Sequence, residues 1–413
     1  MNDAEPARHH TPRELFSHRG FLLFWIARFC STFSAQVVSV AVGWQVYDLT
    51  RNPFDLGLVG LVQFAPALLL VLVTGAASDR FSRRMIFAIC QGVEALCALA
   101  LLVLTATGQI TVGGIFAILF VFGIARAFMN PASSSLIPNL VPAAFLAGAI
   151  ALSASAWQVA TIVGPMAGGL LYGVGPHIAY GVAALLFLAA MILALVIPRP
   201  PQRTMAEPRT WSTILAGFRY VWHERIVLGA ISLDLFAVLL GGAVALLPAF
   251  ARDILDVGPW GLGLLRSANG AGAIVMALYL TWHPVRDRAG LTMFVAVALF
   301  GIFTLVFGVS TIVWVSVVAL ALAGAADMVS VYIRETLIQL WTPDAVRGRV
   351  NAVNMVFVGA SNELGEFRAG VAASFIGLVP AVVMGGIGTV AVAGIWAWMF
   401  PELRKARRLD GRV

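Results

Sequence analysis

The stretch Gly75-Ala-Ala-Ser-Asp-Arg-Phe-Ser-Arg-Arg84 lies between two long apolar runs, residues 56–74 and 85–107, and it decides the fold. A short charged segment between such runs is typical of a loop that joins two membrane-spanning helices. Its three arginines predict the cytoplasmic side, because short cytoplasmic loops carry an excess of Lys and Arg. Cytoplasmic placement of the loop does not require Asp79. A carboxylate at this position is suited to pairing with arginine or to capping a helix.

The composition predicts a polytopic membrane protein. Of the 413 residues 60% are hydrophobic and 11% are charged, with a mean hydropathy of +0.91, whereas soluble proteins carry about 25% charged residues. The basic residues behind the net charge of +7 cluster before the first apolar run, within 199–225 and after residue 400. This distribution predicts a plasma-membrane protein with both termini in the cytoplasm, and a topology signal rather than a nucleic-acid site.

Cysteine usage predicts neither a disulfide framework nor a metal site, because Cys30, Cys90 and Cys97 all fall within apolar runs. The sequence also contains no phosphate-binding loop and no nucleophile motif. We therefore predict no catalytic residue and no cofactor.

Twelve apolar segments are long enough to cross a bilayer, which takes about 20 residues. The predicted spans are 21–46, 55–78, 85–107, 112–136, 145–172, 176–198, 226–250, 258–281, 290–310, 312–340, 348–378 and 380–400. Prolines interrupt the series after the sixth span, and an amphipathic surface helix is predicted at 211–222. The predicted organisation is an N-terminal half (1–198), a cytoplasmic linker (199–225) and a C-terminal half (226–413).

The two halves repeat each other. A shift of 201 residues places Gly123 on Gly324, and at a nearly equal offset Asp287 echoes Asp79 between the corresponding spans. Two parallel six-helix repeats, with a substrate site between them near the bilayer midplane, are an established transporter architecture. The sequence therefore predicts an all-α membrane protein with two pseudo-symmetric halves.

The loop at 75–84 resembles the signature loop between helices 2 and 3 of the major facilitator superfamily. The matching positions are Gly75, Asp79, Arg80, Arg83 and Arg84. Ser82 stands where the superfamily has glycine. In that superfamily the Asp anchors the loop to a neighbouring helix in one of two conformations, so the resemblance implies a conformational switch; a loop that only sets topology is the alternative.

Span 5 contains Gly164-Pro165-Met-Ala-Gly168-Gly169, which resembles a helix-5 element associated with exporters in the same superfamily. Small residues let helices approach closely, and the proline permits a kink. Ordinary small-residue packing is the alternative interpretation.

Segments 231–248, 342–351 and 362–370 are similar to the enterobactin-exporter-like branch of the superfamily. The resemblance implies a secondary active transporter, not an enzyme, that exports a drug- or siderophore-like molecule by alternating access and proton antiport. Its partners would be this hydrophobic or amphipathic small molecule, protons and the lipid bilayer, with the chain acting as a monomer. The alternatives are a facilitator or importer of a polar metabolite, and a non-transporting membrane scaffold or sensor.

Ionisable residues within the spans are costly and therefore mark candidate functional sites. The arginines are Arg28, Arg126, Arg266 and Arg368, and the carboxylates are Glu94, Asp234, Asp327, Glu363 and Glu366. Their near balance predicts pairing within a shared polar interior. Glu94 is expected to be structural, because its helix often packs outward in the superfamily.

The proton-coupling candidates are Asp234, Arg126, Asp327, Glu363 and Glu366. Two interpretations stand for Asp234, a bond to arginine or backbone that holds the fold and a carboxylate that titrates during transport. Glu363 and Glu366 share one face of span 11, where they either pair with arginine or leave one acid protonated. The substrate-cavity candidates combine polar and aromatic side chains: Arg28, Gln36, Trp157, Gln158, Asn354 and Arg368.

Overall fold

A computed structural model describes residues 12–70, 73–74, 77, 80–198, 218–285 and 287–406, and among these no strand occurs. The helices of the first half are α1 (Pro12–Ser17), α2 (Arg19–Thr50), α3 (Pro53–Leu69), α5 (Arg83–Ala106), α6 (Val112–Leu140), η1 (Ala143–Phe145), α7 (Leu146–Val174) and α8 (Pro176–Val196). Those of the second half are α10 (Arg225–Gly241), η2 (Val244–Leu246), α11 (Leu247–Ala249), η3 (Phe250–Ile254), α12 (Pro259–Trp282), α13 (Ala289–Val309), α14 (Val313–Trp341), α15 (Asp344–Ile376), α16 (Leu378–Met399) and α17 (Pro401–Lys405).

The described residues contain ten helical segments that are long and apolar enough to cross a membrane. Two further helices complete the series: α3 is shorter, and α15 is long but more polar because it carries several charges. In order, these twelve segments match the predicted spans, so the prediction of an all-α membrane protein is confirmed. The predicted surface helix at 211–222 lies mostly outside the described residues, which are helical from 218 to 223.

Local sequence signals set several helix ends. Asn52 accepts a hydrogen bond from the Phe54 amide (3.0 Å) just ahead of a proline, and so starts α3. Thr111 accepts from the amide of Gly114 (3.2 Å) in the same way at the start of α6. Gly377 separates α15 from α16 with φ 89°, a left-handed conformation that glycine adopts without strain.

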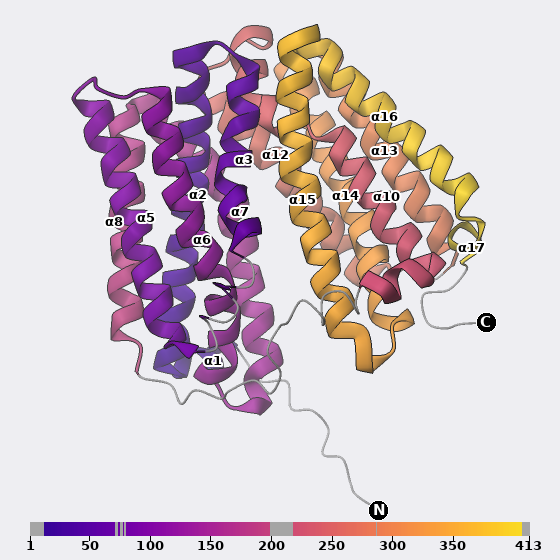
Figure 1. Cartoon of the computed structure of the whole chain (residues 1–413), viewed down its shortest axis with the longest axis horizontal. Helices are drawn as coiled ribbons and strands as arrows, with labels where there is room; N and C mark the ends of the chain where they lie inside the picture. Colours follow the sequence, from indigo (N-terminus) through magenta and orange to yellow (C-terminus); the bar gives the residue numbers. More distant parts are fainter. Residues whose placement is uncertain are drawn as a thin grey trace, which may run out of the picture.

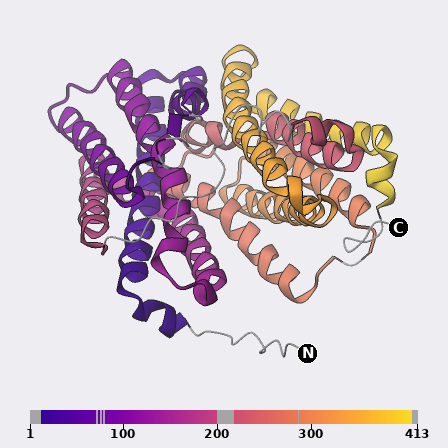
Figure 2. The same cartoon turned by 60° about the horizontal axis from the view of Figure 1, so that its bottom comes forward.

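The same pairs of helices pack together in both halves. In the first half α2 packs on α7 and α8, α5 packs on α6 and α8, and α3 packs on α6. In the second half α10 packs on α15 and α16, α13 packs on α14 and α16, and α12 packs on α14. Figure 1 and Figure 2 show the two groups side by side. When the spans are matched in order, each contact in one half has its counterpart in the other.

One crossing repeats down to its glycine. A Cβ added to Gly123 in α6 would lie 2.3 Å from the carbonyl oxygen of Gln63 in α3. A Cβ added to Gly324 in α14 would lie 2.0 Å from the carbonyl oxygen of Asn269 in α12. Both distances are far below contact distance, so these two positions allow the helices to touch through their backbones.

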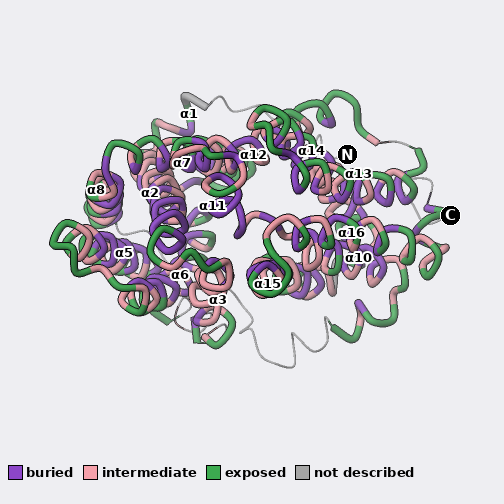
Figure 3. Tube along the Cα trace, turned by 90° about the horizontal axis from the view of Figure 1, so that it is seen from above, coloured by how far each residue is buried: buried purple, intermediate pink, exposed green. Residues whose placement is uncertain are grey.

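The halves meet at one end of the molecule, through α3 with α15 and α7 with α12 (Figure 3). A Cβ on Gly370 would lie 2.8 Å from the Cα of Gly57, and one on Gly169 would lie 3.1 Å from the Cα of Gly263. We call this the closed end; it comprises residues 47–57, 165–176, 250–263 and 367–378. Toward the opposite end, where α1 lies, the ribbons of the two halves spread apart (Figure 1).

Candidate functional site

The seventh span is broken, and the break lies in the molecular interior. Helix α10 ends at Gly241, and the chain then passes through a 3-10 turn, a short helical turn with Pro248 and a π-helix. The last carbonyls of a helix lack partners within it. Here Arg368 of α15 supplies them, with Nε donating to Leu239 O (2.8 Å) and Nη2 donating to Leu240 O (2.5 Å). The predicted substrate-cavity residue Arg368 thus binds backbone in this conformation.

A cavity of about 150 Å³ opens beside this break. Its lining is Val238, Gly241, Gly242, Ala243, Val244, Asn269, Phe300, Thr304, Leu320, Ala323, Asp327, Asn362 and Glu366. Two carboxylates, two amides and a hydroxyl therefore share a wall that is otherwise apolar. The volume suits a few water molecules or one substituent of a larger ligand.

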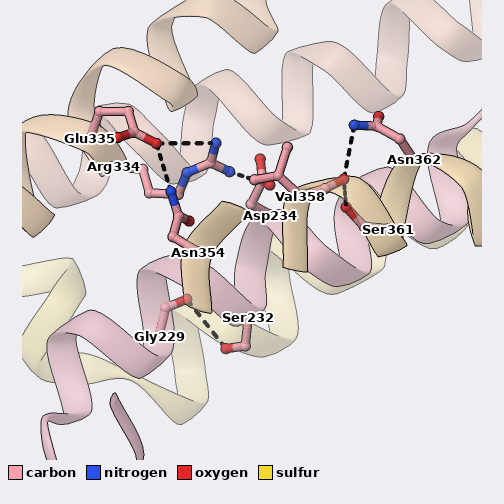
Figure 4. Close-up of polar contacts among 9 residues, drawn as sticks. All are labelled: Gly229, Ser232, Asp234, Arg334, Glu335, Asn354, Val358, Ser361 and Asn362. Carbon is pink, nitrogen blue, oxygen red and sulfur yellow. Dashed lines mark hydrogen bonds and ion pairs between the residues drawn. The ribbon is translucent and has the colours of Figure 1, made fainter. Parts of the chain in front are cut away.

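Asp234 in α10 forms an ion pair with Arg334 in α14, and Figure 4 shows the two side chains pointing toward one another. Both are almost wholly buried, with side chains 8% and 4% exposed. Arg334 also lies 3.8 Å from Glu335, which accepts a hydrogen bond from the Asn354 amide of α15 (2.8 Å). The network therefore links α10, α14 and α15.

Asp327 lies on α14 about two helical turns before Arg334. The charges of Asp234 and Arg334 both act on it. Asp234 alone of these two carboxylates forms an ion pair with Arg334 among the described residues, and Asp327 is the one that lines the cavity.

Glu363 and Glu366 both reach from α15 toward α3 in the other half. A Cβ added to Gly60 would lie 2.6 Å from Glu363 Oε2 and 3.2 Å from Glu366 Oε2. The charge of Arg266 in α12 acts on both acids, and its Nη1 donates to Ser39 Oγ of α2 (2.9 Å). These acids consequently lie where the halves meet.

The predicted switch loop is described only in part, since Gly75 and Asp79 lie outside the described residues. Arg80 is exposed. Arg83 is buried and donates to Ser135 O of α6 (3.0 Å), and Arg84 donates to Ile197 O just after α8 (2.6 Å). The two arginines therefore tie the start of α5 to its neighbours, and the switching role stays a prediction.

The helix-5 motif forms a junction of three helices. Gly164 and Gly168 both face α2. A Cβ on Gly164 would lie 2.6 Å from Gln36 Cβ, and one on Gly168 would lie 2.9 Å from Val37 Cα. Gly169 instead faces α12, where an added Cβ would lie 2.3 Å from the Pro259 carbonyl oxygen. The carbonyl of Pro165 faces α12 as well. The motif thus packs one half against the other at the closed end.

The remaining candidates of the first half lie on α2, α6 and α7. Arg28 donates to Ser133 Oγ of α6 (3.4 Å). Arg126 lies over the ring of Phe122, 5.9 Å from its centroid. Trp157 is exposed and Gln158 is half-buried. No contact in the described residues brings these side chains into one cluster.

Glu94 is fully buried, on a helix whose opposite face is exposed. Its exposed fraction is 0%, and it belongs to the inward face of α5. The outward face of α5 carries Ile89, Leu96 and Val103 instead, all exposed. The position of Glu94 is therefore an interior one.

The closed end carries reciprocal ion pairs that the sequence alone did not reveal. Asp48 of α2 pairs with Arg252 of η3, and Arg51 pairs with Asp253 (3.2 Å). Tyr47 donates to Asp253 as well. The side chains of Asp48 and Asp253 are partly exposed, at 45% and 36%. Their partners lie in the opposite half, which no sequence pattern indicates.

Sequence reasoning also missed Arg334 and Glu335. Both fall within the predicted tenth span at 312–340, but near its end, where a charge is easily taken for an interfacial one. The signal that could have found them was the surplus of carboxylates over arginines among the candidates within the spans of the second half, which are Asp234, Asp327, Glu363 and Glu366 against Arg266 and Arg368. Every buried carboxylate needs a partner or a proton.

Residues 11–410 match the family of transmembrane secretion effectors, a branch of the major facilitator superfamily. The chain belongs to that family. The enterobactin exporter of Shigella boydii is 25% identical over 413 residues, covering 97% of this chain and 96% of that protein. The enterobactin exporter of Escherichia coli O1:K1 is also 25% identical with the same coverage. The family member is thus a multi-pass membrane transporter.

Solved structures support the fold. The nucleoside transporter NupG (D323A mutant) superposes with a TM-score of 0.74 at 13% identity, over 92% of this chain and 100% of that one. A POT family transporter in complex with 5-aminolevulinic acid gives 0.75 at 11% identity, over 93% and 96%. At these identities the similarity establishes the major facilitator fold alone.

Proposed function

We propose that this transporter is a proton-coupled exporter of a small hydrophobic or amphipathic molecule, drug-like or siderophore-like, in the bacterial inner membrane. Full-length similarity to enterobactin exporters supports export of such a molecule. Buried carboxylates in both halves would have no role in a simple facilitator or in a non-transporting scaffold. Against an importer of a polar metabolite, the same similarity to enterobactin exporters favours export.

The observation that carries proton coupling is the position of Asp327. It lines the cavity beside the broken seventh span, and the charges of the buried ion pair of Asp234 and Arg334 act on it. An unpaired carboxylate in the membrane interior is costly, and a proton removes that cost. Proton binding at Asp327 would change the charge that acts on the pair of Asp234 and Arg334, and so would alter the packing of α10 on α14.

The orientation follows from the arginine distribution, which favours cytoplasmic termini. With that orientation the closed end faces away from the cytoplasm, and the spreading end faces it. Such a conformation would load substrate from the cytoplasm. Release outside then requires the ion pairs and glycine contacts of the closed end to separate.

Transport from reconstituted vesicles tests the proposal. Cells with and without the gene are first challenged with toxic lipophilic compounds and catecholate siderophores to find a substrate. Purified protein in vesicles should then move that substrate uphill when a proton gradient is imposed, and should stop when an uncoupler is added. Uphill movement that survives the uncoupler, or facilitated movement that never runs uphill, would contradict the proposal.

Two variants locate the coupling. Asp327→Asn and Asp234→Asn should each abolish uphill export while leaving downhill exchange measurable, with Asp327→Asn the cleaner of the two because Asp234 also holds an ion pair. Asp256→Asn is the matched control, since Asp256 is exposed and its φ of 50° suits asparagine equally well. Full uphill export by both interior variants would remove this site from the mechanism.

A further inference from the structure

A second buried carboxylate lies in the first half, away from the site described above. Glu94 is 0% exposed, and neither of its carboxyl oxygens has a hydrogen-bond partner among the described residues. Gln91, one turn earlier on the same face of α5, donates to Ser31 Oγ of α2 (2.8 Å) and to Met129 Sδ of α6 (2.9 Å). Glu94 therefore lies on the side of α5 that faces α2 and α6.

Two hydrogen bonds set the register of α2 along α5. One is the bond from Gln91 to Ser31, and the other runs from Gln45 Nε2 to Thr105 Oγ1 (3.1 Å). In each bond the two residues are 60 apart in the sequence. Residues that differ by 60 in number thus lie at one level. By this register Ser34 lies at the level of Glu94, and its hydroxyl is likewise buried and unpartnered within the described chain.

The charged side chain that acts on Glu94 is Arg126 of α6. Helix α6 runs antiparallel to α5, and the contact of Gln91 with Met129 brings Arg126, one turn further, to the level of Glu94. The charge of Arg126 acts on Glu94 and also on Glu363 of α15, in the other half. Within the described residues no ion pair closer than 4 Å joins Arg126 to either acid.

The other titratable groups near Glu94 are two thiols on its own helix, Cys90 and Cys97, both buried. They cannot neutralise a carboxylate. An ionised Glu94 would lack both solvent and hydrogen-bond donors, which is the costliest arrangement for a buried charge. A carboxylic acid at the same place needs no counter-charge.

We infer that Glu94 is a proton-binding site of the N-terminal half, un-ionised in this conformation while Arg126 keeps its charge. The proton bound here leaves Arg126 free to act on Glu363 across the interface between halves. Loss of the proton would draw Arg126 back toward Glu94. Because Glu94 is 0% exposed, it exchanges its proton with water only in another conformation. Proton occupancy at Glu94 is thereby linked to the attraction between Arg126 of α6 and Glu363 of α15.

Infrared spectroscopy of the purified full chain in lipid nanodiscs at neutral pH tests the occupancy. Glu94→Gln should remove a C=O stretch of an un-ionised carboxylic acid. Glu402→Gln is the matched control, because Glu402 is half exposed and pairs with Arg225 (3.5 Å), and it should leave that region unchanged. Loss of a carboxylate band on Glu94→Gln, with the acid region intact, would overturn the inference.

A second variant keeps the test decisive if Glu94→Gln folds poorly. Glu94→Met preserves size without a polar end. If Glu94 is un-ionised, the thermal midpoint of Glu94→Met should stay close to that of the wild type. If Glu94 is an anion that Arg126 neutralises, the same change would leave the half-buried Arg126 without its counter-charge, and the midpoint would drop.

The role in transport rests on the proposed proton coupling, whereas the occupancy does not. In vesicles, Glu94→Gln should keep downhill exchange but flatten the pH dependence of export, and Glu94→Asp should restore it. Wild-type export that ignores the proton gradient, together with the expected infrared loss, would refute the proposed function and leave the proton site standing. Proton-driven export with no infrared or pH effect of Glu94→Gln would refute the site alone.

Discussion

The two halves share one arrangement of helices but hold their interior charges differently. In the C-terminal half Asp234 and Arg334 form a buried ion pair. In the N-terminal half Arg126 and Glu94 influence each other without such a pair among the described residues. The two halves therefore share the positions where helices cross, but only the C-terminal half neutralises its buried carboxylate with a paired arginine.

The largest expected effect comes from removing the arginine of the paired half. Arg334→Met leaves Asp234 buried without a partner, which costs about 3–5 kcal/mol. Arg126→Met should cost much less, because Glu94 does not depend on it. Chemical unfolding of both variants in the same detergent measures the difference.

The double variant Asp234→Leu/Arg334→Met sharpens this result. Replacing both members by apolar residues should recover most of the stability, since neither charge is then left alone. Equal losses in Arg126→Met and Arg334→Met would show that the two halves handle charge alike, and the comparison would fail.

The second prediction concerns the broken seventh span, whose counterpart α2 runs unbroken from Arg19 to Thr50. Arg368→Met removes the donors to Leu239 O and Leu240 O. Hydrogen bonds to a charged group contribute about 1.5–3 kcal/mol each, and water entering the cavity would replace part of that. We expect a loss of about 2 kcal/mol in detergent unfolding. Arg404→Met, at an exposed position of α17, is the control and should be neutral.

The third prediction tests the crossing that the halves have in common. Gly123→Ala and Gly324→Ala each force a Cβ against a backbone carbonyl, at 2.3 Å and 2.0 Å. Overpacking of this kind costs about 1–3 kcal/mol. Gly113→Ala and Gly394→Ala are controls, because an added Cβ meets nothing within 4 Å there. A neutral result at Gly123 with a loss at Gly324 would show that only one half needs the close approach.

How much the sequence could predict follows from the same comparison. Span positions and the crossing glycines depend on apolar length and on small residues in a repeat, which are readable along the chain. The partner of Asp234 was not readable, because Arg334 lies a hundred residues away on a helix whose rotation only packing sets. The inward position of Glu94 was not readable either, because it depends on how α5 packs against other helices.

The smallest effect is expected where the halves meet through matching elements. At the closed end, the end of α2 with its C-cap residue Arg51 supplies one acid and one base, and η3 does the same. The resulting pairs are Asp48–Arg252 and Arg51–Asp253. Arg252 also lies over the ring of Trp44, 5.5 Å from its centroid. These side chains are partly exposed, so each pair contributes only about 0–1 kcal/mol to unfolding stability.

Their influence should instead appear in the balance between conformations, because the pairs exist only while the closed end is closed. About 1 kcal/mol changes such an equilibrium roughly fivefold. Asp48→Arg should therefore open the closed end measurably, seen as longer distances between spin labels placed on either side of it, in a background whose native cysteines have been replaced. The swap Asp48→Arg/Arg252→Asp should close it again, since it rebuilds the pair with reversed sign. If Asp48→Arg leaves the distances unchanged, the glycine contacts of α3 with α15 and α7 with α12 hold the end closed by themselves, and the reciprocal charges are incidental to the cycle.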